Sequence, residues 1–439
     1  MDGTSGRITA VRASTDATTD YYARNMSYWP SGALKEMKYE TKGAGAPTVW
    51  EQRCYNGRNQ MTAVRVANAT ATDCANTTAG IFYSSYTYGT GAANNGNVMA
   101  GTIGRWVSGT SLSWTQSYSY DTRNRLTGVT DSAYTQGFLY DPSGNRALNA
   151  NAGQTTYNPE MATFVPTATD VAGVLAVFSR NRWNGNVHDS AGNVTGVNSN
   201  SYQYTYDAES RMVTSAVPGS SITASYEYDG TGKRVRKTVN GQHWLYVYDA
   251  PGALAAEYPA SGQAATWTGR RYVMGDMLGS ARMSMTDAGA VVECMDYTPF
   301  GTEIQRSLRG NMGCYLVNPT NKVPPGTPPV SGEVQPGNGV NEQFTSQVRD
   351  SETGLDYFGA RYMSAAQGRF GSPDMATGDR MRPQTFNSYQ YALNNPLRFV
   401  DPSGHYEEDV HFDLTYRSNI RPGPCRGAVP FGVICGRFR

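Results

Sequence analysis

The 439-residue sequence lacks most of the patterns that mark a metalloprotein, a nucleotide-binding enzyme or a membrane protein. It holds four histidines, and none of them stands in an H-E-x-x-H or similar metal-binding spacing. No G-x-S-x-G elbow supports a Ser-His-Asp triad, and no Walker or Rossmann glycine phrase opens a helix after a strand. No run of about 18 apolar residues is present. The sequence therefore predicts no bound metal, no cofactor and no transmembrane helix.

Charge is also scarce. Charged residues make up 17% of the chain and the net charge is +1, with no basic stripe. This balance argues against nucleic-acid binding driven by electrostatics. The N-terminal residues lack the charged-then-apolar pattern of a signal peptide. Some secretion systems do not require a signal peptide, so its absence does not argue against export of the protein.

The six cysteines include no C-x-x-C pair, which weakens zinc and thioredoxin-like interpretations. They fall into three sequence-local pairs: Cys54 with Cys74, Cys294 with Cys314, and Cys425 with Cys435. Two interpretations stay open. The pairs form local hairpin disulfides after export, or the cysteines are isolated small residues of the core.

Glycine and tyrosine are abundant, at 48 and 30 residues. Together with Thr, Ser and Asn they favour strands joined by tight turns, because aromatic and β-branched side chains suit a pleated surface. Long runs of Ala, Leu, Glu and Lys are missing. The composition thus predicts a mainly β protein and argues against a helical bundle.

A repeat runs through the middle of the chain. Its frame is aromatic-x-Tyr-Asp, a short turn with Gly or Asn, a basic or polar residue, and an alternating strand. The aspartates of the copies are Asp121, Asp141, Asp189, Asp207, Asp229 and Asp249. From Asp121 to Asp141 and from Asp189 to Asp249, neighbouring copies lie about 20 residues apart, which is the length of two short strands and two turns. Each copy is therefore predicted to form a β-hairpin.

The residue types explain the hairpin. The Asp at the turn entry can accept backbone N–H bonds two residues on, and the following Gly adopts positive φ. Tyr residues two positions apart lie on one face of a strand. A single hairpin cannot bury that face, so the copies must pack side by side in a sheet that curls or closes. Catalysis by Tyr and Asp is the alternative, but repetition at fixed spacing favours a structural role.

These phrases resemble the YD repeats of RHS (rearrangement hot spot) proteins and of the C components of insecticidal toxin complexes. Residues 21–40 and 55–64 look like degenerate copies. Residues 274–301 are similar to the phrase that opens the RHS-associated core, and 344–374 and 386–405 match its second half. A Pro- and Gly-rich stretch, 311–341, separates the two halves and reads as an exposed loop.

The resemblance predicts three parts: a YD-repeat shell (1–269), an RHS-associated core (270–405) and a variable tail (406–439). The expected fold is a curled antiparallel sheet, a partial cocoon, that the core domain caps as a plug. The implied function is to enclose and deliver a C-terminal toxin in competition between bacteria. The chain would act outside the cell or at its surface after a cytoplasmic stage. Its expected partners are its own tail as cargo, an immunity protein and secretion machinery.

Two other interpretations remain. The chain is a surface adhesin or carbohydrate-binding β protein, or it is an inactive, truncated remnant. The direction of the tyrosines distinguishes the first of these from a shell. Tyrosines that face solvent along a groove favour sugar binding, whereas tyrosines turned inward favour a shell.

The closing motif carries the candidate chemistry. Pro396, Asp401, Pro402 and Gly404 fit the family pattern, whose final leucine is replaced here by His405. The resemblance implies that Asp374 and Asp401 cut the chain between His405 and Tyr406, with Arg361 as the supporting cation. Two close carboxylates cannot both ionise easily, so one serves as acid and the other as base for the attack of water.

Structural roles are the alternative for the same residues. The Asp401–Gly404 turn has a twin of identical sequence at Asp141–Gly144. Asp374 could cap a turn, and Arg361 could be a packed structural ion. Because an apolar residue is expected to fill a pocket before the scissile bond, His405 weakens the prediction of cleavage.

The tail changes character after His405. Val410, Phe412, Leu414 and Tyr416 alternate as in a strand, and the remainder has five arginines, no acidic residue, and Pro and Gly at spacings that predict neither helix nor strand. A domain of this length rarely folds without a disulfide, a structural metal or a similar cross-link. The tail is interpreted as a truncated or frameshifted toxin stub, with a small basic effector peptide as the alternative.

Overall fold

The structure is a computed structural model of the chain. It describes residues 7–12, 21–43, 45–72, 80–107, 110–153, 165–197, 201–219, 223–249, 254–259, 270–304, 341–375, 378–405, 408–409, 428–429 and 432–436. Antiparallel strands dominate these residues, as the composition predicts. Among them, no helix has the length and apolar character needed to cross a bilayer.

The first sheet is a meander of twelve strands whose spatial order follows the sequence. Its strands are β1 (Val11–Arg12), β2 (Tyr21–Tyr28), β3 (Leu34–Tyr39), β4 (Val49–Tyr55), β5 (Met61–Ala67), β6 (Phe82–Tyr88), β7 (Val98–Val107), β8 (Thr110–Tyr120), β9 (Leu126–Thr130), β10 (Thr135–Tyr140), β11 (Arg146–Asn149) and β12 (Thr167–Ala168). All neighbouring pairs are antiparallel except β11 and β12, which are parallel. Helix α2 (Val171–Val177) and the hairpin of β13 (Phe178–Ser179) and β14 (Arg182–Trp183) follow.

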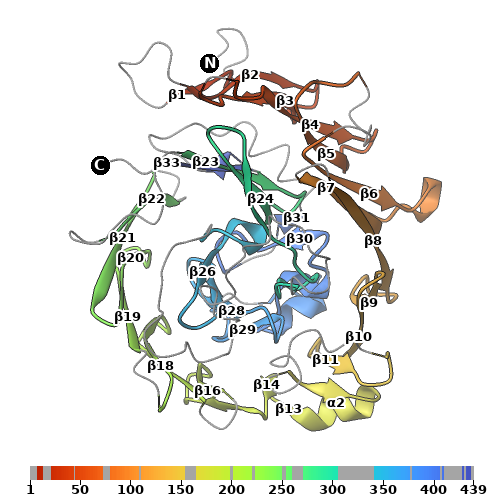
Figure 1. The fold of residues 1–439 in the computed structure, drawn as a ribbon. Coiled ribbons are helices and arrows are strands. Elements are labelled where there is room, and N and C mark those ends of the chain that lie inside the picture. The colour runs from red at the N-terminus through yellow and green to blue at the C-terminus, as the bar shows by residue number, and fades with distance from the viewer. Residues whose placement is uncertain are drawn as a thin grey trace.

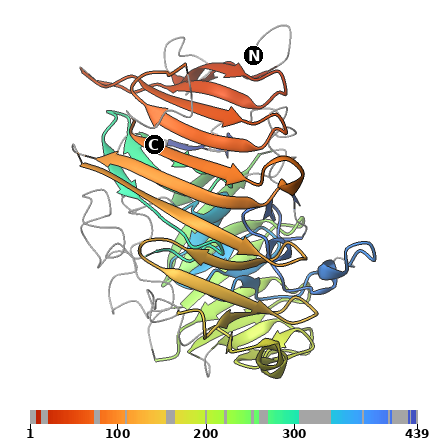
Figure 2. The same cartoon turned by 90° about the vertical axis from the view of Figure 1, so that its right-hand side faces the viewer.

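A second meander of eight strands continues the wall. Its strands are β15 (Asn186–His188), β16 (Val194–Val197), β17 (Tyr202–Tyr206), β18 (Met212–Ala216), β19 (Thr223–Tyr228), β20 (Arg234–Val239), β21 (Gln242–Tyr248) and β22 (Leu254–Pro259). Figure 1 shows the two meanders as one curled wall, joined at the α2 side, that surrounds the later strands of the chain. Figure 2 shows the strands of the first meander stacked along the height of this wall. The wall curls without closing into a barrel, as predicted.

Each repeat copy forms the predicted hairpin. The carboxylate of Asp207, for example, accepts the backbone N–H of Glu209 (2.9 Å) and of Arg211 (3.0 Å). The same pattern recurs at Asp121 and Asp229. Positive φ falls at the third position after the aspartate in each of five copies: Asn124, Gly144, Gly192, Ser210 and Gly232.

The tyrosine that precedes the aspartate joins each copy to the copy before it. Its hydroxyl donates a hydrogen bond to a backbone carbonyl on the neighbouring hairpin, as Tyr228 does to Met212 at 2.6 Å. The basic residue of one copy also lies over the tyrosine ring of the next, as Arg211 does over Tyr228. The same hydroxyl-to-carbonyl bond is made by Tyr120, Tyr140, Tyr206 and Tyr248. The YD phrase therefore encodes both the turn and the stacking of hairpins.

The centre of the curled wall is occupied by a small four-stranded sheet, which we call the plug sheet. It contains β26 (Val348–Asp350), β27 (Leu355–Tyr357), β28 (Tyr362–Ser364) and β29 (Arg369–Phe370). The short 3-10 turns η3 (Phe344–Ser346), η4 (Pro383–Phe386) and η5 (Ala392–Asn394) flank it, and η1 (Gly91–Ala93) belongs to the wall. The sheet lies where a plug that caps the shell is expected.

The tyrosines of the wall point inward. Along β17, β19 and β21 the buried residues alternate with exposed ones, and Tyr204, Tyr226 and Tyr246 are buried while Leu245 is exposed. These rings form one apolar cluster with Tyr357 and Tyr362 of the plug sheet. A larger cluster joins the inner face of the first meander to residues 272–304 and to the plug. The inward direction of the rings is the arrangement predicted for a shell.

The tail prediction was wrong in one respect. Spacing of Pro and Gly predicted neither helix nor strand after Arg417, yet β32 (Ala428–Val429) and β33 (Gly432–Gly436) lie there. Strand β33 adds to the edge of β23 (Arg270–Gly275), with Arg270 opposite Gly436 and Tyr272 opposite Ile434. The other edge of β23 pairs with β24 (Ala281–Thr286), which pairs in turn with β25 (Val291–Cys294). Backbone pairing to an available edge stabilises the strand, and local propensity does not report such an edge.

Both cysteines whose side chains the structure describes form disulfides. Cys54 and Cys294 are each disulfide-bonded, so for these two residues the interpretation as isolated core residues is wrong. Cys74, Cys314 and Cys425 lie outside the described residues, and only the backbone of Cys435 is described. The three local pairings stay a prediction. The Pro- and Gly-rich stretch up to residue 340 also lies outside the described residues.

Candidate functional site

Arg361 is the hub of the candidate site. It directly precedes β28, is buried, and lies with its guanidinium 3.7 Å from the centre of the Phe370 ring. Its Nη1 donates to the carbonyl of Ser388 (2.9 Å), and its Nε donates to the carbonyl of Gly404. The guanidinium therefore ties the plug sheet to both segments that carry the predicted aspartates.

The structure brings the two predicted aspartates together on this guanidinium. The Nη2 atom of Arg361 lies 2.8 Å from Oδ2 of Asp374 and 3.3 Å from Oδ2 of Asp401. Asp401 is almost fully buried, with 1% of its side chain exposed, whereas 14% of the Asp374 side chain is exposed. The two residues lie far apart in sequence, and the backbone N–H of Asp374 is held by the carbonyl of Ser388 (2.8 Å).

A tight turn wraps the Asp401 carboxylate. Its Oδ1 accepts the backbone N–H of Ser403 (3.3 Å), Gly404 (2.7 Å) and His405 (3.1 Å). Burial raises the pKa of Asp401 above its usual value, and the nearby Asp374 carboxylate adds to the increase, while Arg361 and the N–H donors oppose it. Asp401 therefore keeps its proton to a higher pH than an exposed aspartate does.

Gly404 makes this turn fit against the plug. Its φ is +78°, and a Cβ at this position would lie 2.8 Å from the carbonyl oxygen of Phe358 and 3.0 Å from the backbone nitrogen of Arg361. The turn is held there by a hydrogen bond from Ala360 N–H to the carbonyl of Ser403 (3.0 Å). Of the two motif prolines, Pro396 is buried beside η5 and Pro402 is half-buried inside the turn.

His405 lies at the edge of the site, beside the first carboxylate. Its Nδ1 is 3.5 Å from Oδ1 of Asp374, and 51% of its side chain is exposed. Tyr406 lies outside the described residues. The turn is bracketed by β30 (Phe399–Val400) and β31 (Glu408–Asp409), which pair antiparallel. The predicted scissile bond therefore belongs to the connection of a short hairpin.

Comparison with the repeat turns identifies what is special here. Asp207 pairs with a cation of its own turn, Arg211, at 2.7 Å, and Asp141 pairs with Asn145 of its own turn at 2.7 Å. Asp401 has His405 at that fourth position, and its cation, Arg361, comes from the plug instead. The backbone turn is ordinary, but its cation comes from another segment and is shared with a carboxylate from a third segment. In the Asp207 turn the second carboxylate on Arg211, that of Glu209 (2.9 Å), belongs to the same turn and is exposed.

Sequence reasoning missed a second charged cluster, which we call the wall–plug ion cluster: Arg234 and Lys237 of β20 with Asp350 and Glu352 of the plug. Asp350 accepts hydrogen bonds from Arg234 and from Lys237 (2.9 Å), and Lys237 also reaches Glu352 (3.3 Å). All four side chains are buried. The rings of Tyr357 and Tyr246 lie 4.4 and 4.6 Å from the Arg234 guanidinium. The repeat frame predicts a basic residue at this turn, but it does not predict a partner on another segment of the chain.

No metal site emerges from the part of the chain that the structure describes. Within it, no group of three or more His, Cys, Asp or Glu side chains is arranged to hold a metal ion. The chemistry that the described site offers is that of two carboxylates on one guanidinium.

The chain resembles known proteins in sequence. The family described as Teneurin YD-shell matches residues 99–309. The chain is 30% identical over 226 residues to "tRNA nuclease WapA" of Bacillus subtilis (strain 168), covering 50% of this chain and 9% of that protein. It is 27% identical over 319 residues to "Probable deoxyribonuclease RhsA" of Dickeya dadantii (strain 3937), covering 66% of this chain and 21% of that protein. The chain thus spans about a tenth to a fifth of the length of these relatives.

Solved structures share the fold. The crystal structure of TcdB2-TccC3-Cdc42 superposes with a TM-score of 0.53 at 16% identity, covering 92% of this chain and 19% of that chain. The Tc holotoxin pore of Photorhabdus luminescens superposes with a TM-score of 0.51 over 92% of this chain. At this identity the likeness concerns the fold, a curled YD-repeat wall around a central plug.

Proposed function

This chain is a YD-repeat protein of the RHS type, and we propose that it is the C-terminal shell and plug of a polymorphic toxin that encloses and delivers a C-terminal effector. The observation that carries the proposal is the pair of Asp374 and Asp401 on Arg361, directly before the boundary that the sequence predicts between the shell and the variable tail. A shell that releases cargo needs a cut at this boundary. Residues 1–269 then form the wall, 270–405 the plug-bearing core, and 406–439 the cargo or what remains of it.

The pair has the properties that hydrolysis of the 405–406 peptide bond requires. Asp374 is the more exposed carboxylate and serves as the base that takes a proton from water as the water adds to the His405 carbonyl. Asp401, whose pKa is raised by burial, serves as the acid that gives its proton to the Tyr406 nitrogen. The products are a carboxyl at His405 and a new amino terminus at Tyr406. Arg361 orients both carboxylates throughout.

His405 determines the efficiency of this reaction. Its imidazole lies near the Asp374 carboxylate, where a leucine would offer no polar atom. The imidazole competes with the attacking water for the Asp374 carboxylate. The His405→Leu variant is therefore expected to cleave faster than the wild type.

Intact-mass measurement under denaturing conditions tests the proposal. Denaturation is needed because β33 pairs with β23, and β31 with β30, so a cut tail stays attached to the folded shell. The wild type and His405→Leu are expected to lose the mass of residues 406–439, whereas Asp374→Asn and Asp401→Asn stay intact.

Asp121→Asn is the matched control, because Asp121 accepts backbone N–H bonds in the same kind of turn and pairs with Arg125 of its own turn (2.7 Å), and it should cleave like the wild type. A wild type and a His405→Leu variant that both remain intact after long incubation would refute self-cleavage and identify the chain as a silent remnant.

The expected partners and location follow from the same proposal. The cargo is the chain's own tail, and an immunity protein and a secretion machine would handle it before and during export to the surface or the medium. The inward tyrosines argue against the alternative of a sugar-binding adhesin, because Tyr204, Tyr226 and Tyr246 are buried against the plug and offer no ring to a ligand outside.

A further inference from the structure

A left-handed turn lies between the two segments that hold the carboxylates of the candidate site. Ala392, Leu393 and Asn394 follow one another with φ of +50°, +50° and +59°. All three residues are buried. Left-handed backbone is disfavoured for residues that carry a Cβ, and Ala and Leu lack the short polar side chain that lets Asn tolerate it. Such strain persists only where the surrounding structure holds it, so the contacts of this turn matter.

The turn connects the Asp374 side of the site to the Asp401 side. Upstream of it, the carbonyl of Ser388 accepts the N–H of Asp374 (2.8 Å). Downstream of it, the carbonyl of Asn395 accepts the N–H of Phe399 (3.0 Å), the first residue of β30, and Asp401 directly follows that strand. Because the turn sets the direction of the chain between these two anchors, it determines where Asp401 lies relative to Asp374.

The wall supplies contacts that hold the turn. The side-chain amide of Asn394 donates to the carbonyl of Gly144 (2.9 Å). The amide of Asn395 donates to the carbonyl of Asn124 (2.8 Å) and to Oδ1 of Asn97 (2.9 Å). Both side chains are almost fully buried, at 2% and 1% exposed. Their acceptors lie in the β6–β7, β8–β9 and β10–β11 connections, which are successive loops on one rim of the first meander, so one dipeptide of the plug joins three loops of the wall.

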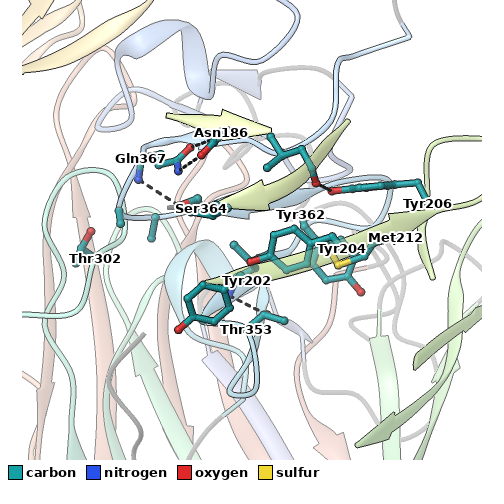
Figure 3. Close-up of a pocket in the computed structure, with 17 residues that line it drawn as sticks. Asn186, Tyr202, Tyr204, Tyr206, Met212, Thr302, Thr353, Tyr362, Ser364 and Gln367 are labelled. Carbon is teal, nitrogen blue, oxygen red and sulfur yellow. Dashed lines mark hydrogen bonds between the residues drawn. The ribbon is translucent and has the colours of Figure 1, made fainter. Parts of the chain in front are cut away.

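A second amide contact joins the wall and the plug away from this connection. Figure 3 shows Asn186 of β15 and Gln367, which follows β28, exchanging hydrogen bonds of 3.1 and 3.3 Å. Gln367 is buried like the two asparagines. It lies outside residues 388–401, so this contact has the same chemistry but does not lie on the path between the two anchors.

We propose that Asn394 and Asn395 are positioning residues, which hold the carboxylate pair in place by anchoring the left-handed turn to the wall. When the wall loops are folded, the bonds of the two amides offset the strain of the turn. Without these bonds the turn relaxes, and the Asp401 segment leaves Arg361. The pair is therefore completed only on a folded wall, so that the cut follows the assembly of the shell. The effect on cleavage rests on the proposed function, whereas the effect on the position of Asp401 does not.

The cleavage rate of the folded full-length chain tests the proposal. Rates are compared in buffer where urea unfolding shows each variant to be folded. Asn395→Ala removes both bonds to the wall and should slow the appearance of the 1–405 fragment by about tenfold, the factor expected when buried acceptors lose their donor. Gln367→Ala is the matched control: it removes the amide contact of Figure 3, and should lower the midpoint of urea unfolding but cleave at the wild-type rate.

A glycine in the turn separates positioning from packing. Ala392→Gly removes the penalty for left-handed backbone together with one buried methyl group. In the Asn395→Ala background it should restore most of the lost cleavage rate, because the turn then needs less support from the wall. A merely structural role predicts the opposite result, since losing the methyl group weakens the core further.

Hydrogen exchange tests the placement of the closing turn without cleavage. The N–H of Ala360 bonds to the carbonyl of Ser403 (3.0 Å), where that turn meets the plug. Exchange at this N–H is measured in the Asp374→Asn background, which is expected to stay uncut. There, Asn395→Ala should speed the exchange by about tenfold, whereas Gln367→Ala should leave it unchanged.

Two results would overturn the proposal. Equal exchange at Ala360 in Asn395→Ala and Gln367→Ala would mean that the amides do not place the closing turn. Cleavage rates that follow stability alone, with no rescue by Ala392→Gly, would mean that the amides only pack the core. If the wild type does not cleave but the exchange responds as expected, self-cleavage fails while the positioning role stands. If Asn395→Ala fails to fold, Asn97→Ala removes one of its two acceptors and should give a smaller effect in the same direction.

Discussion

The wall–plug ion cluster gives the sharpest test of how the shell holds its plug. It contains two cations from β20, Arg234 and Lys237, and two carboxylates from the plug, Asp350 and Glu352, all buried. The substitution Asp350→Asn keeps the shape of the side chain but removes one negative charge. The cluster then carries one positive charge with no counter-charge. The amide NH₂ of the new Asn also places a hydrogen-bond donor next to the donor groups of Arg234 and Lys237.

The cost of that change follows from the burial. Breaking a buried ion pair by removing one partner destabilises a protein by about 3–5 kcal/mol, because the remaining charge stays desolvated. Burial alone would raise the pKa of Asp350, but Arg234 and Lys237 hold it below its usual value, so the carboxylate is ionised throughout the neutral range. We therefore expect Asp350→Asn to lower the free energy of unfolding by about 3–5 kcal/mol.

Urea unfolding followed by intrinsic fluorescence measures the effect. Trp244 lies buried beside Lys237, 5.7 Å from its ammonium group, and reports the local packing. The control is Arg236→Gln: Arg236 lies on the same strand but pairs with Glu227 at the outer, exposed face. Removing such a surface pair changes stability by about 0–1 kcal/mol.

A double variant separates charge from shape. Lys237→Met in the Asp350→Asn background removes the unmatched cation, and the pair of substitutions should destabilise the protein by less than the sum of the two single effects. The reasoning is refuted if Asp350→Asn costs no more than Arg236→Gln, or if the double variant shows strict additivity.

Three further predictions follow from the turns and the repeat. Gly404→Ala forces a Cβ against the Phe358 carbonyl and a strained φ, so it should lower the thermal midpoint, at a cost of about 1–3 kcal/mol for the strain alone, as differential scanning calorimetry would show. Tyr228→Phe leaves the buried Met212 carbonyl without its donor and should cost about 1–3 kcal/mol in urea unfolding. Because the folded-state pKa of Asp401 is raised, its ionised form opposes folding above that pKa. The stability of the wild type relative to Asp401→Asn should therefore rise as the pH falls from 7 toward about 4, and a difference that is constant or falls with acidity would contradict the assigned shift.

The repeat was predictable because its information is local. An aspartate, a residue that tolerates positive φ and a tyrosine two positions from another aromatic residue are each sufficient for their part of the hairpin. The alternation of buried and exposed residues along β17 follows directly from the period of two. Serine at position 210 adopts positive φ although the pattern called for Gly or Asn, because the hydrogen bonds to Asp207 fix the turn.

One copy of the repeat turn was not predicted from the sequence. Asp276 accepts the backbone N–H of Leu278 (2.9 Å) and Ser280 (3.0 Å), and its other oxygen binds Arg282 (2.8 Å). This is the turn of a repeat copy, but Gly275 stands where the tyrosine is expected. The Asp-to-Gly spacing was the signal that could have found it. A search for the Asp turn alone, without the preceding tyrosine, would have extended the repeat to this position.

The partners of buried charges could not be predicted, because they come from distant parts of the chain. Arg105 of β7 binds Asp296 (3.0 Å), and Arg349 of β26 binds Asp356 of the next strand (2.7 Å). The second pair is local and could be guessed from a hairpin register. The pair of Arg105 and Asp296 depends on how the wall curls around the core, and no short sequence pattern predicts that curvature.

The site at the boundary combines these two kinds of information. The turn of Asp401 is local, and its twin at Asp141 folds the same way without a second carboxylate at its pairing partner, Asn145. What distinguishes Asp401 from the repeat aspartates is the source of its cation: Asp121, for example, pairs with Arg125 of its own turn (2.7 Å). At Asp401 that position is held by a histidine, so the carboxylate is left to share Arg361 with Asp374. Burial and the neighbouring Asp374 carboxylate raise the pKa of Asp401, and the shared Arg361 opposes that rise, so the proton on Asp401 follows from where the turn is packed rather than from the turn itself.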